Sequence, residues 1–230
     1  MTLAANQPYF LPYFPYWQLI AAADAFLVSD DYAFMKGKWI PRNRIQVYGR
    51  VQYMRIEVEH QSCHRLIKDC TLAPMDMAQK LRTIEMAYHR APYFAEGYEL
   101  AREILMYPET NLADFLYHSI EKVCAYMGID TPLLKTSDIT GNCLLRREKR
   151  VFDFCHRLGA ENYINPIGGQ KLYDKEEFRR EGVNLSFIHT ETSPYDQGLD
   201  HFVPDLSVID VIMFNSRDAL HERLGQYSLI

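Results

Sequence analysis

Two neighbouring carboxylates, Asp30 and Asp31, are the residues of this sequence best placed for acid–base chemistry. They directly follow the apolar run Ala25–Ser29, which we expect to form a buried strand. Like charges close together raise the pKa of one member, so such a pair can act as a general base or bind a metal ion. Because neighbours in an extended chain point in opposite directions, one of the two can equally serve as a turn cap. We interpret both as candidate catalytic residues.

Six cationic residues lie between positions 36 and 55 with no acidic residue among them: Lys36, Lys38, Arg42, Arg44, Arg50 and Arg55. Trp39 and Pro41 make the segment that leads to Arg42 and Asn43 rigid. Guanidinium groups bind phosphate or carboxylate well. This pattern predicts an anionic small molecule, such as a nucleotide sugar, bound by Lys36, Trp39, Arg42 and Asn43. A solvated hairpin face is the alternative interpretation of the same charges.

The loop Gln7–Trp17 follows the first expected strand and holds three prolines and six aromatic residues. Prolines stiffen the chain, and rigid aromatic faces suit a sugar ring or another planar group. No glycine occurs before Gly37, so a glycine-based phosphate loop cannot form here. We interpret Gln7, Tyr9 and Tyr13 as candidate ligand-binding residues. An aromatic corner that merely covers the sheet edge would also explain the pattern.

Three further features are candidates for substrate binding. Gly168 and Gly169 follow an expected strand, where glycines allow a ligand to approach the backbone closely, although a plain turn needs them too. Tyr195 and Gln197 form the second feature. Ser207 and Asp210 form the third, because they lie one helical turn apart, but Ser207 or Asp205 can also be a helix N-cap.

Histidines and cysteines give no convincing metal site. His60, Cys63, His64 and Cys70 are zinc-ligand types, but their spacing matches neither a zinc finger nor a zinc ribbon. We therefore expect a polar surface loop there and no metal, and the sequence leaves the cofactor unknown. A hydrolase serine is disfavoured because the sequence has no GxSxG motif.

The composition indicates some classes of protein and excludes others. The chain has 230 residues, a net charge of −5 and 48% apolar residues, so we expect a globular protein that does not bind nucleic acid broadly. No stretch is apolar enough to span a membrane. No basic segment resembles a signal peptide, and none of the five cysteines forms a CxxC pair. These features predict a cytoplasmic location. Aromatic residues are concentrated early, since positions 1–48 hold 11 of the 30.

Hydrophobic periodicity predicts alternating strands and helices within a single domain, 1–230. We expect strands at 2–6, 25–29, 132–137, 162–165 and 183–188, a hairpin within 45–58 that turns at Gly49, and helices at 16–23, 75–90, 94–106, 111–128, 146–158 and 174–181. This order indicates a three-layer α/β fold with a mostly parallel sheet and a helical insertion at about 75–128. Ligands bind such sheets at the carboxyl ends of strands, so loops 7–15, 30–44, 166–172 and the segment after Ile188 are the places for a site.

Several of these motifs, taken in order, resemble the WbqC-like family of bacterial proteins. The matching pieces are Gln7–Pro12, Ala23–Phe26 leading to Asp30 and Asp31, Trp39–Ile45, Tyr88 before Ala91–Phe94, the Gly168–Gly169 turn with Tyr173, Tyr195 with Gln197, and Phe202–Asp210. One departure is that Ser216 and Arg217 follow Asn215, where the family tends to have a glycine soon after.

The resemblance implies a cytoplasmic protein of surface-polysaccharide (O-antigen) biosynthesis. Transfer of an aminoacyl group, for instance glycyl, to a nucleotide-linked or lipid-linked amino sugar is the activity it suggests. On this interpretation Arg42 and Asn43 would hold an anionic donor or sugar phosphate, and Asp30 or Asp31 would accept the proton of the attacking amine. The alternative is a non-catalytic ligand-binding or scaffolding protein of a polysaccharide assembly complex.

The opening unit is also similar to Rossmann-like, nucleotidylyltransferase-like folds. In those folds the loop after the first strand carries paired histidines that bind phosphates, whereas here Tyr13, Phe14, Pro15 and Tyr16 occupy that region. A shared topology would therefore come without the nucleotidyl transfer chemistry.

Overall fold

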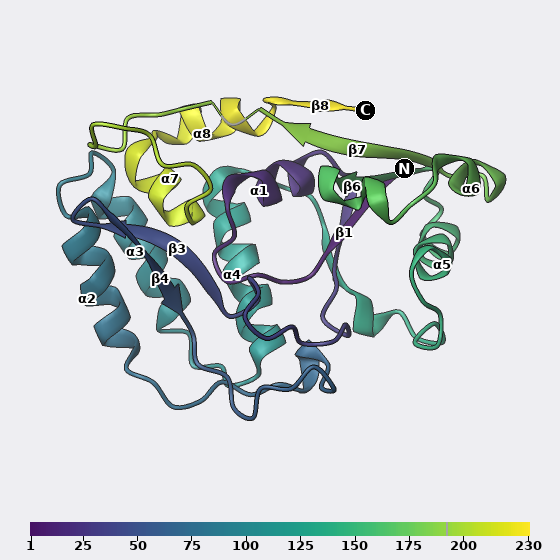
Figure 1. Cartoon of the computed structure of the whole chain (residues 1–230), viewed down its shortest axis with the longest axis horizontal. Helices are drawn as coiled ribbons and strands as arrows, with labels where there is room; N and C mark the ends of the chain where they lie inside the picture. The colour runs from purple at the N-terminus through teal and green to yellow at the C-terminus, as the bar shows by residue number, and fades with distance from the viewer. Residues whose placement is uncertain (192) are drawn as a thin grey trace.

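A six-stranded sheet forms the centre of the computed structural model, which describes residues 1–191 and 193–230 (Figure 1). Its strand order is β5-β2-β1-β6-β7-β8. All neighbouring pairs are parallel except β7 and β8. The strands are β1 (Thr2–Asn6), β2 (Ala25–Val28), β5 (Leu133–Lys135), β6 (Asn162–Pro166), β7 (Asn184–Thr190) and β8 (Tyr227–Leu229). The predicted α/β fold with a mostly parallel sheet is therefore confirmed.

Helices cover both faces of this sheet because residues along each central strand alternate between two apolar environments. Leu3 of β1 and Leu27 of β2 pack with α5 (Glu148–Leu158) and α6 (Lys175–Arg180). Ala4 and Phe26 face the opposite way, toward α1 (Phe14–Ala21), α4 (Leu112–Met127), α7 (Val208–Phe214) and α8 (Arg217–Leu224). The sheet is thus buried on both sides, as is typical of parallel sheets.

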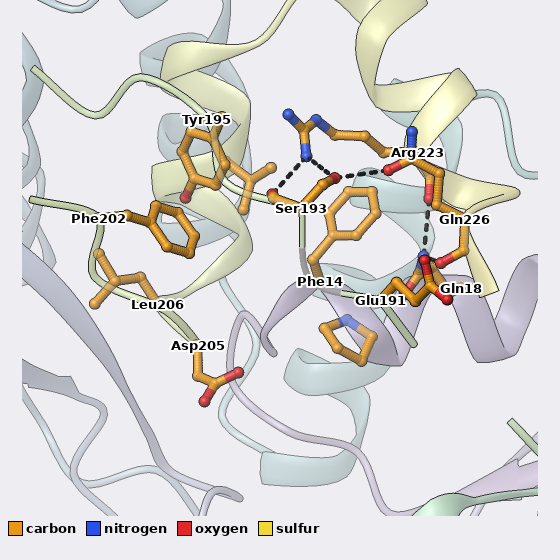
Figure 2. Close-up of a pocket in the computed structure, with 12 residues that line it drawn as sticks. Phe14, Gln18, Glu191, Ser193, Tyr195, Phe202, Asp205, Leu206, Arg223 and Gln226 are labelled. Atoms are coloured by element: carbon orange, nitrogen blue, oxygen red, sulfur yellow. Dashed lines mark hydrogen bonds between the residues drawn. The ribbon is translucent and has the colours of Figure 1, made fainter. Parts of the chain in front are cut away.

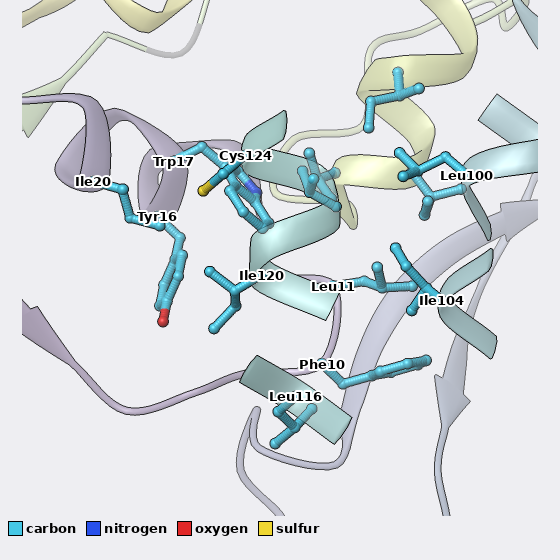
Figure 3. Packing of buried hydrophobic residues seen from close by; sticks show 14 of the residues in the cluster. Phe10, Leu11, Tyr16, Trp17, Ile20, Leu100, Ile104, Leu116, Ile120 and Cys124 are labelled. Carbon is cyan, nitrogen blue, oxygen red and sulfur yellow. The ribbon is translucent and has the colours of Figure 1, made fainter. Parts of the chain in front are cut away.

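The middle of the chain is helical, as predicted, and consists of α2 (Met77–Tyr88), α3 (Phe94–Leu105) and α4. These helices share one apolar core with the sheet face that bears Phe26, and Figure 3 shows part of it around Trp17, Ile104 and Ile120. A separate antiparallel hairpin, β3 (Arg42–Val47) and β4 (Arg50–Arg55), is connected to the same core through Ile45. The helical segment is therefore packed into the core that also contains Phe10, Leu11 and Trp17 of the loop Gln7–Trp17, which we call the Pro-aromatic loop.

Local capping explains several element boundaries. The side chain of Asn111 accepts hydrogen bonds from the backbone at the start of α4, and Gly128 ends that helix in the left-handed conformation, as predicted. Helix α1 begins at Phe14 rather than at Tyr16, because proline is well tolerated in a first helical turn and Pro15 lies there. Beyond Ile188, Ser207 caps α7, as one of the two alternatives for this residue predicted, whereas α8 and β8 were not predicted. Their short length leaves little periodicity to detect.

The order in which successive strands are added to the sheet reverses between β1 and β6, although the two strands are parallel. From β1 the chain moves to β2 and then β5 on one side, and it later returns to β6 on the other side of β1. In open α/β sheets the crevice at such a switch point, outside the carboxyl ends of the strands, is where ligands bind. The carboxyl ends of β1 and β6 are therefore the first place to look for a site.

Candidate functional site

A cleft of about 490 Å³ lies at the carboxyl ends of β1 and β6. Its volume lies in the range of small-molecule sites. The strand ends supply Asn6 and Asn165, and all four loops expected to hold a site contribute to the wall. The lining residues are Asn6, Tyr9, Pro12, Tyr13, Trp39, Asn43, Arg44, Asn165, Pro166, Gly168, Gly169, Leu172 and Asp205. The cleft thus combines aromatic faces, amide groups and one charge of each sign.

Tyr9, Tyr13 and Trp39 supply the aromatic faces of the cleft. Burial raises the pKa of both phenols, and the nearby Asp205 carboxylate raises the pKa of Tyr13 further. Both hydroxyls therefore stay protonated at neutral pH and can donate hydrogen bonds to a ligand. The loop that carries them is fixed at its start, because the Tyr16 hydroxyl donates to the Gln7 carbonyl at 3.1 Å. Gln7 does not itself line the cleft.

Asn43 lines the cleft, but its amide is occupied by the protein. Its Nδ2 donates to the carbonyl of Leu11, and its Oδ1 accepts from the Arg44 backbone N–H at 2.8 Å. Ser207, another predicted binding residue, donates to the same Leu11 carbonyl and caps α7. Both side chains therefore position the Pro-aromatic loop.

Arg44 and Asp205 place opposite charges at the cleft. The Arg44 Nη2 donates to the Asp205 carbonyl at 2.9 Å, and it lies 3.9 Å from the Asp205 carboxylate. The guanidinium carbon of Arg44 lies 6.0 Å from the centre of the Trp39 ring. Asp205 has a φ of 56°, a left-handed conformation that is uncommon outside glycine. Its carboxylate remains about half exposed, so it is available to a ligand.

The two candidate glycines differ in what surrounds them. A Cβ on Gly169 would collide with the side-chain amide of Asn165, lying 2.9 Å from its Cγ, so only glycine allows Asn165 its place in the cleft. A Cβ on Gly168 would meet nothing within 4 Å. Both glycines lie in a 3₁₀ helix, η3 (Ile167–Lys171), rather than in a plain turn. Gly169 is therefore required by packing, and Gly168 leaves open space beside the cleft.

Asp30 and Asp31 are not among the residues that line the cleft. Asp30 is buried and accepts hydrogen bonds from the Ser137 hydroxyl at 2.6 Å and the Ser137 backbone N–H at 3.0 Å. Asp31 accepts from Thr136 Oγ1 at 2.6 Å and forms a buried ion pair with Arg150. These contacts connect the end of β2 to η2 (Thr136–Asp138) and α5. They give both carboxylates a structural role.

Tyr195, Gln197 and Asp210 form a polar cluster outside the cleft lining, in which Gln197 and Asp210 are buried. The Asp210 carboxylate accepts from the Tyr195 hydroxyl at 2.7 Å, from Gln197 Nε2 at 3.0 Å and from the Tyr88 hydroxyl at 3.0 Å. Burial raises the pKa of Asp210, and the three donors oppose that rise. The Gln197 side chain also accepts from the Val203 N–H at 2.8 Å. The cluster therefore anchors the segment that carries Asp205.

A second, smaller cavity of about 40 Å³ lies beside this cluster (Figure 2). Tyr195, Phe202 and Leu206 line it, and so does Arg223, whose guanidinium carbon lies 5.4 Å from the centre of the Tyr195 ring and which donates to the Ser193 hydroxyl at 2.8 Å. This volume holds only a few water molecules, so it cannot accept a sugar.

Two predicted binding residues, Lys36 and Arg42, do not line the cleft. Lys36 is exposed in the loop before β3. The Arg42 guanidinium donates to the Gly37 carbonyl, and its carbon lies 4.4 Å from the centre of the Tyr53 ring. Within residues 1–191 and 193–230, no cluster of three or more metal-ligating side chains occurs, and His60 is exposed.

Sequence reasoning missed several cleft residues, above all Asn6, Asn165 and Asp205. One signal could have identified the two asparagines. Each is a polar residue at the end of an apolar strand, and the two strands are adjacent in the sheet. Asp205 gave no comparable signal, because its position depends on a left-handed turn that no glycine marks.

Comparison with known proteins identifies the family of this chain. The model of the WbqC-like protein family matches residues 7–222. This chain belongs to the WbqC-like family. The uncharacterized protein Rv1507c of Mycobacterium tuberculosis (strain ATCC 25618 / H37Rv) is similar to it, with 27% identity over 217 residues that cover 93% of each chain. No solved structure matches. None of the helices that the structure describes is long and apolar enough to cross a membrane. The matched WbqC-like segment includes every residue of the cleft except Asn6.

Proposed function

We propose that the cleft binds an amino sugar carried on an anionic group, and that the protein transfers an acyl or aminoacyl group, such as glycyl, to the sugar amine during bacterial surface-polysaccharide biosynthesis. The observation that carries the proposal is the composition of the cleft. Tyr9, Tyr13 and Trp39 offer faces on which a sugar ring can stack, and Asn165 offers an amide to its hydroxyls. Arg44 offers a guanidinium to a phosphate.

The residues of the cleft can also support the transfer step. The sugar amine would attack the carbonyl carbon of an activated acyl donor, forming a C–N bond while the bond to the donor's leaving group breaks. The proton released by the amine needs an acceptor within hydrogen-bond reach. We favour Asp205 for this role, because this residue lines the cleft and its side chain is about half exposed, whereas the oxygens of Asp30 and Asp31 accept hydrogen bonds from Thr136, Ser137 and Arg150.

A ligand-binding screen tests the first half of this proposal. Nucleotide-linked amino sugars, the free amino sugars and nucleotides alone would be added to the protein, and the unfolding temperature measured. A ligand well above its Kd stabilises the native state by RT ln(1 + [L]/Kd). Trp39→Ala should weaken binding about tenfold, since one ring contact is lost. Tyr107→Ala removes a comparably exposed aromatic outside the cleft and should leave binding unchanged. Equal effects of the two variants would contradict the proposal.

Asp205→Asn and Asp31→Asn separate the two candidate bases. If Asp205 accepts the proton, Asp205→Asn keeps sugar binding but loses transfer by about a hundredfold or more. Asp31→Asn should then affect the stability of the protein rather than transfer per folded molecule. Sugar binding with no transfer from any acyl donor would instead favour the alternative function, a non-catalytic binding protein of a polysaccharide assembly complex.

A further inference from the structure

The exposed face of the β3–β4 hairpin carries charge of one sign. Positions 32–56 contain six of the chain's 25 lysines and arginines and none of its 30 acidic residues. Among residues 1–191 and 193–230, Arg44 alone of these six has an acidic side chain within 4.0 Å, namely Asp205. In a protein of net charge −5, this segregation produces a local positive surface whose charges are available to an external partner.

Large apolar side chains share that surface. Met35, Trp39, Tyr48, Val51 and Tyr53 are all exposed, Tyr48 by 71% and Tyr53 by 45%. Strand register places Tyr53 beside a cation, because Arg44 pairs with Tyr53, and the neighbouring pair on the same face is Arg42 with Arg55. The centres of the Trp39 and Tyr53 rings are 6.3 Å apart, and the Arg42 guanidinium lies over Tyr53. The hairpin therefore presents interleaved aromatic rings and guanidinium groups.

We propose that this hairpin surface, defined by Met35, Lys36, Lys38, Trp39, Tyr48, Val51, Tyr53 and Arg55, docks on an anionic phospholipid membrane. Lysine and arginine are attracted to anionic headgroups, and tryptophan and tyrosine favour the interface between water and hydrocarbon. Met35 and Val51 offer no hydrogen bonds to an RNA but can enter the acyl region. The acidic remainder of the chain would be repelled by the same membrane, which orients the hairpin toward it.

The position of the surface has a consequence for the substrate. Trp39 belongs both to the hairpin surface and to the wall of the cleft, so a docked protein would hold the cleft near the headgroups. This consequence rests on the proposed function. If the cleft binds an amino sugar, membrane docking favours the lipid-linked form of that sugar over the nucleotide-linked form. The anionic group that joins such a sugar to its lipid lies at the level of the headgroups.

Vesicle co-sedimentation with the full chain tests the docking. Vesicles of equal parts phosphatidylcholine and phosphatidylglycerol should bind the protein, with weaker binding at higher salt, and vesicles of phosphatidylcholine alone should not. Lys38→Glu/Arg55→Glu should lower the partition coefficient by about tenfold or more. The matched control Lys149→Glu/Arg180→Glu reverses two exposed cations outside this surface and should retain binding. Tyr48→Ser/Val51→Ser should weaken binding without changing the net charge.

Three results would overturn the docking proposal: equal binding to both kinds of vesicle, equal losses in the two charge-reversal variants, or binding of a single-stranded RNA oligonucleotide in preference to anionic vesicles. The outcome of the amino-sugar screen is independent of these variants, since none of the substituted residues lines the cleft. Vesicle binding without sugar binding would refute the proposed function and leave the docking intact. Sugar binding without vesicle binding would refute the docking and leave the proposed function intact.

Discussion

Asn43 and Ser207, which are 164 positions apart in the sequence, donate hydrogen bonds to the same carbonyl oxygen, that of Leu11. The distances are 2.8 Å from Asn43 Nδ2 and 2.9 Å from Ser207 Oγ. Leu11 has a φ of 44°, which a leucine rarely adopts. The two donors thus stabilise an unfavourable backbone conformation in the loop that carries Tyr9 and Tyr13, and they connect three distant segments at the cleft.

This relationship predicts a specific coupling between the two side chains. Asn43→Ala should lower the free energy of unfolding by about 2 kcal/mol and Ser207→Ala by about 1 kcal/mol, because each single variant leaves the Leu11 carbonyl with one donor. The double variant leaves the buried carbonyl with neither donor, so its loss should exceed the sum by about 1 kcal/mol. Urea unfolding measures all three variants.

Ser119→Ala is a suitable control for this cycle. The Ser119 hydroxyl is fully buried, and it has no hydrogen-bond partner among the residues that the structure describes. Its removal should therefore be neutral or slightly stabilising. Strict additivity of Asn43→Ala and Ser207→Ala would mean that the shared carbonyl does not couple them.

Asp210 predicts a defined pH dependence of stability. Burial raises its pKa in the native state, so between the unfolded value of about 3.9 and the raised native value the native state binds more protons than the unfolded state. The contribution of Asp210 to stability therefore falls as pH increases through this window. Asp210→Asn removes the titration. Relative to this variant, the wild-type protein should gain stability as pH is lowered from 7 toward 4, measured by urea unfolding. A difference that is constant with pH, or of opposite slope, would show that the native pKa is not raised.

Much of the fold is predictable from the sequence because long helices and strands have strong apolar patterns. Helix α4 is one case, since Asn111 and Gly128 mark its two ends chemically and its apolar stripe is continuous. The helices at the end of the chain are not predictable from such a pattern. There, α7 spans only Val208–Phe214, and six consecutive residues of it are buried, so no amphipathic period exists to detect.

The candidate site was predictable in location but less so in chemistry. Of the residues predicted to bind a ligand, Trp39 and Tyr13 line the cleft, and their binding role stays a prediction. Residue types could not distinguish a side chain that faces the cleft from one that is used internally, because that depends on partners far away in sequence. Asn43 is occupied by Leu11, and Asp31 is occupied by Arg150.

Gly168 and Gly169 offer a matched pair of substitutions. Gly169→Ala would force its new Cβ against the Asn165 amide, so it should lower the free energy of unfolding by about 1–3 kcal/mol and displace Asn165 from the cleft. Gly168→Ala meets only open space and should change stability by less than about 0.5 kcal/mol. Thermal and urea unfolding of the two variants measure the difference. Equal losses would indicate that both glycines serve the backbone conformation rather than the packing of Asn165.

The buried Arg150–Asp31 pair predicts that losing one partner costs more than losing both. Arg150→Met would leave the Asp31 carboxylate buried without its cation, and the free energy of unfolding should fall by about 3–5 kcal/mol. The double variant Arg150→Met/Asp31→Leu removes both charges and should recover part of that loss. Chemical denaturation measures both variants. If Asp31 were instead a catalytic base with little structural role, Asp31→Asn would abolish transfer at unchanged stability, and the double variant would be no more stable than Arg150→Met.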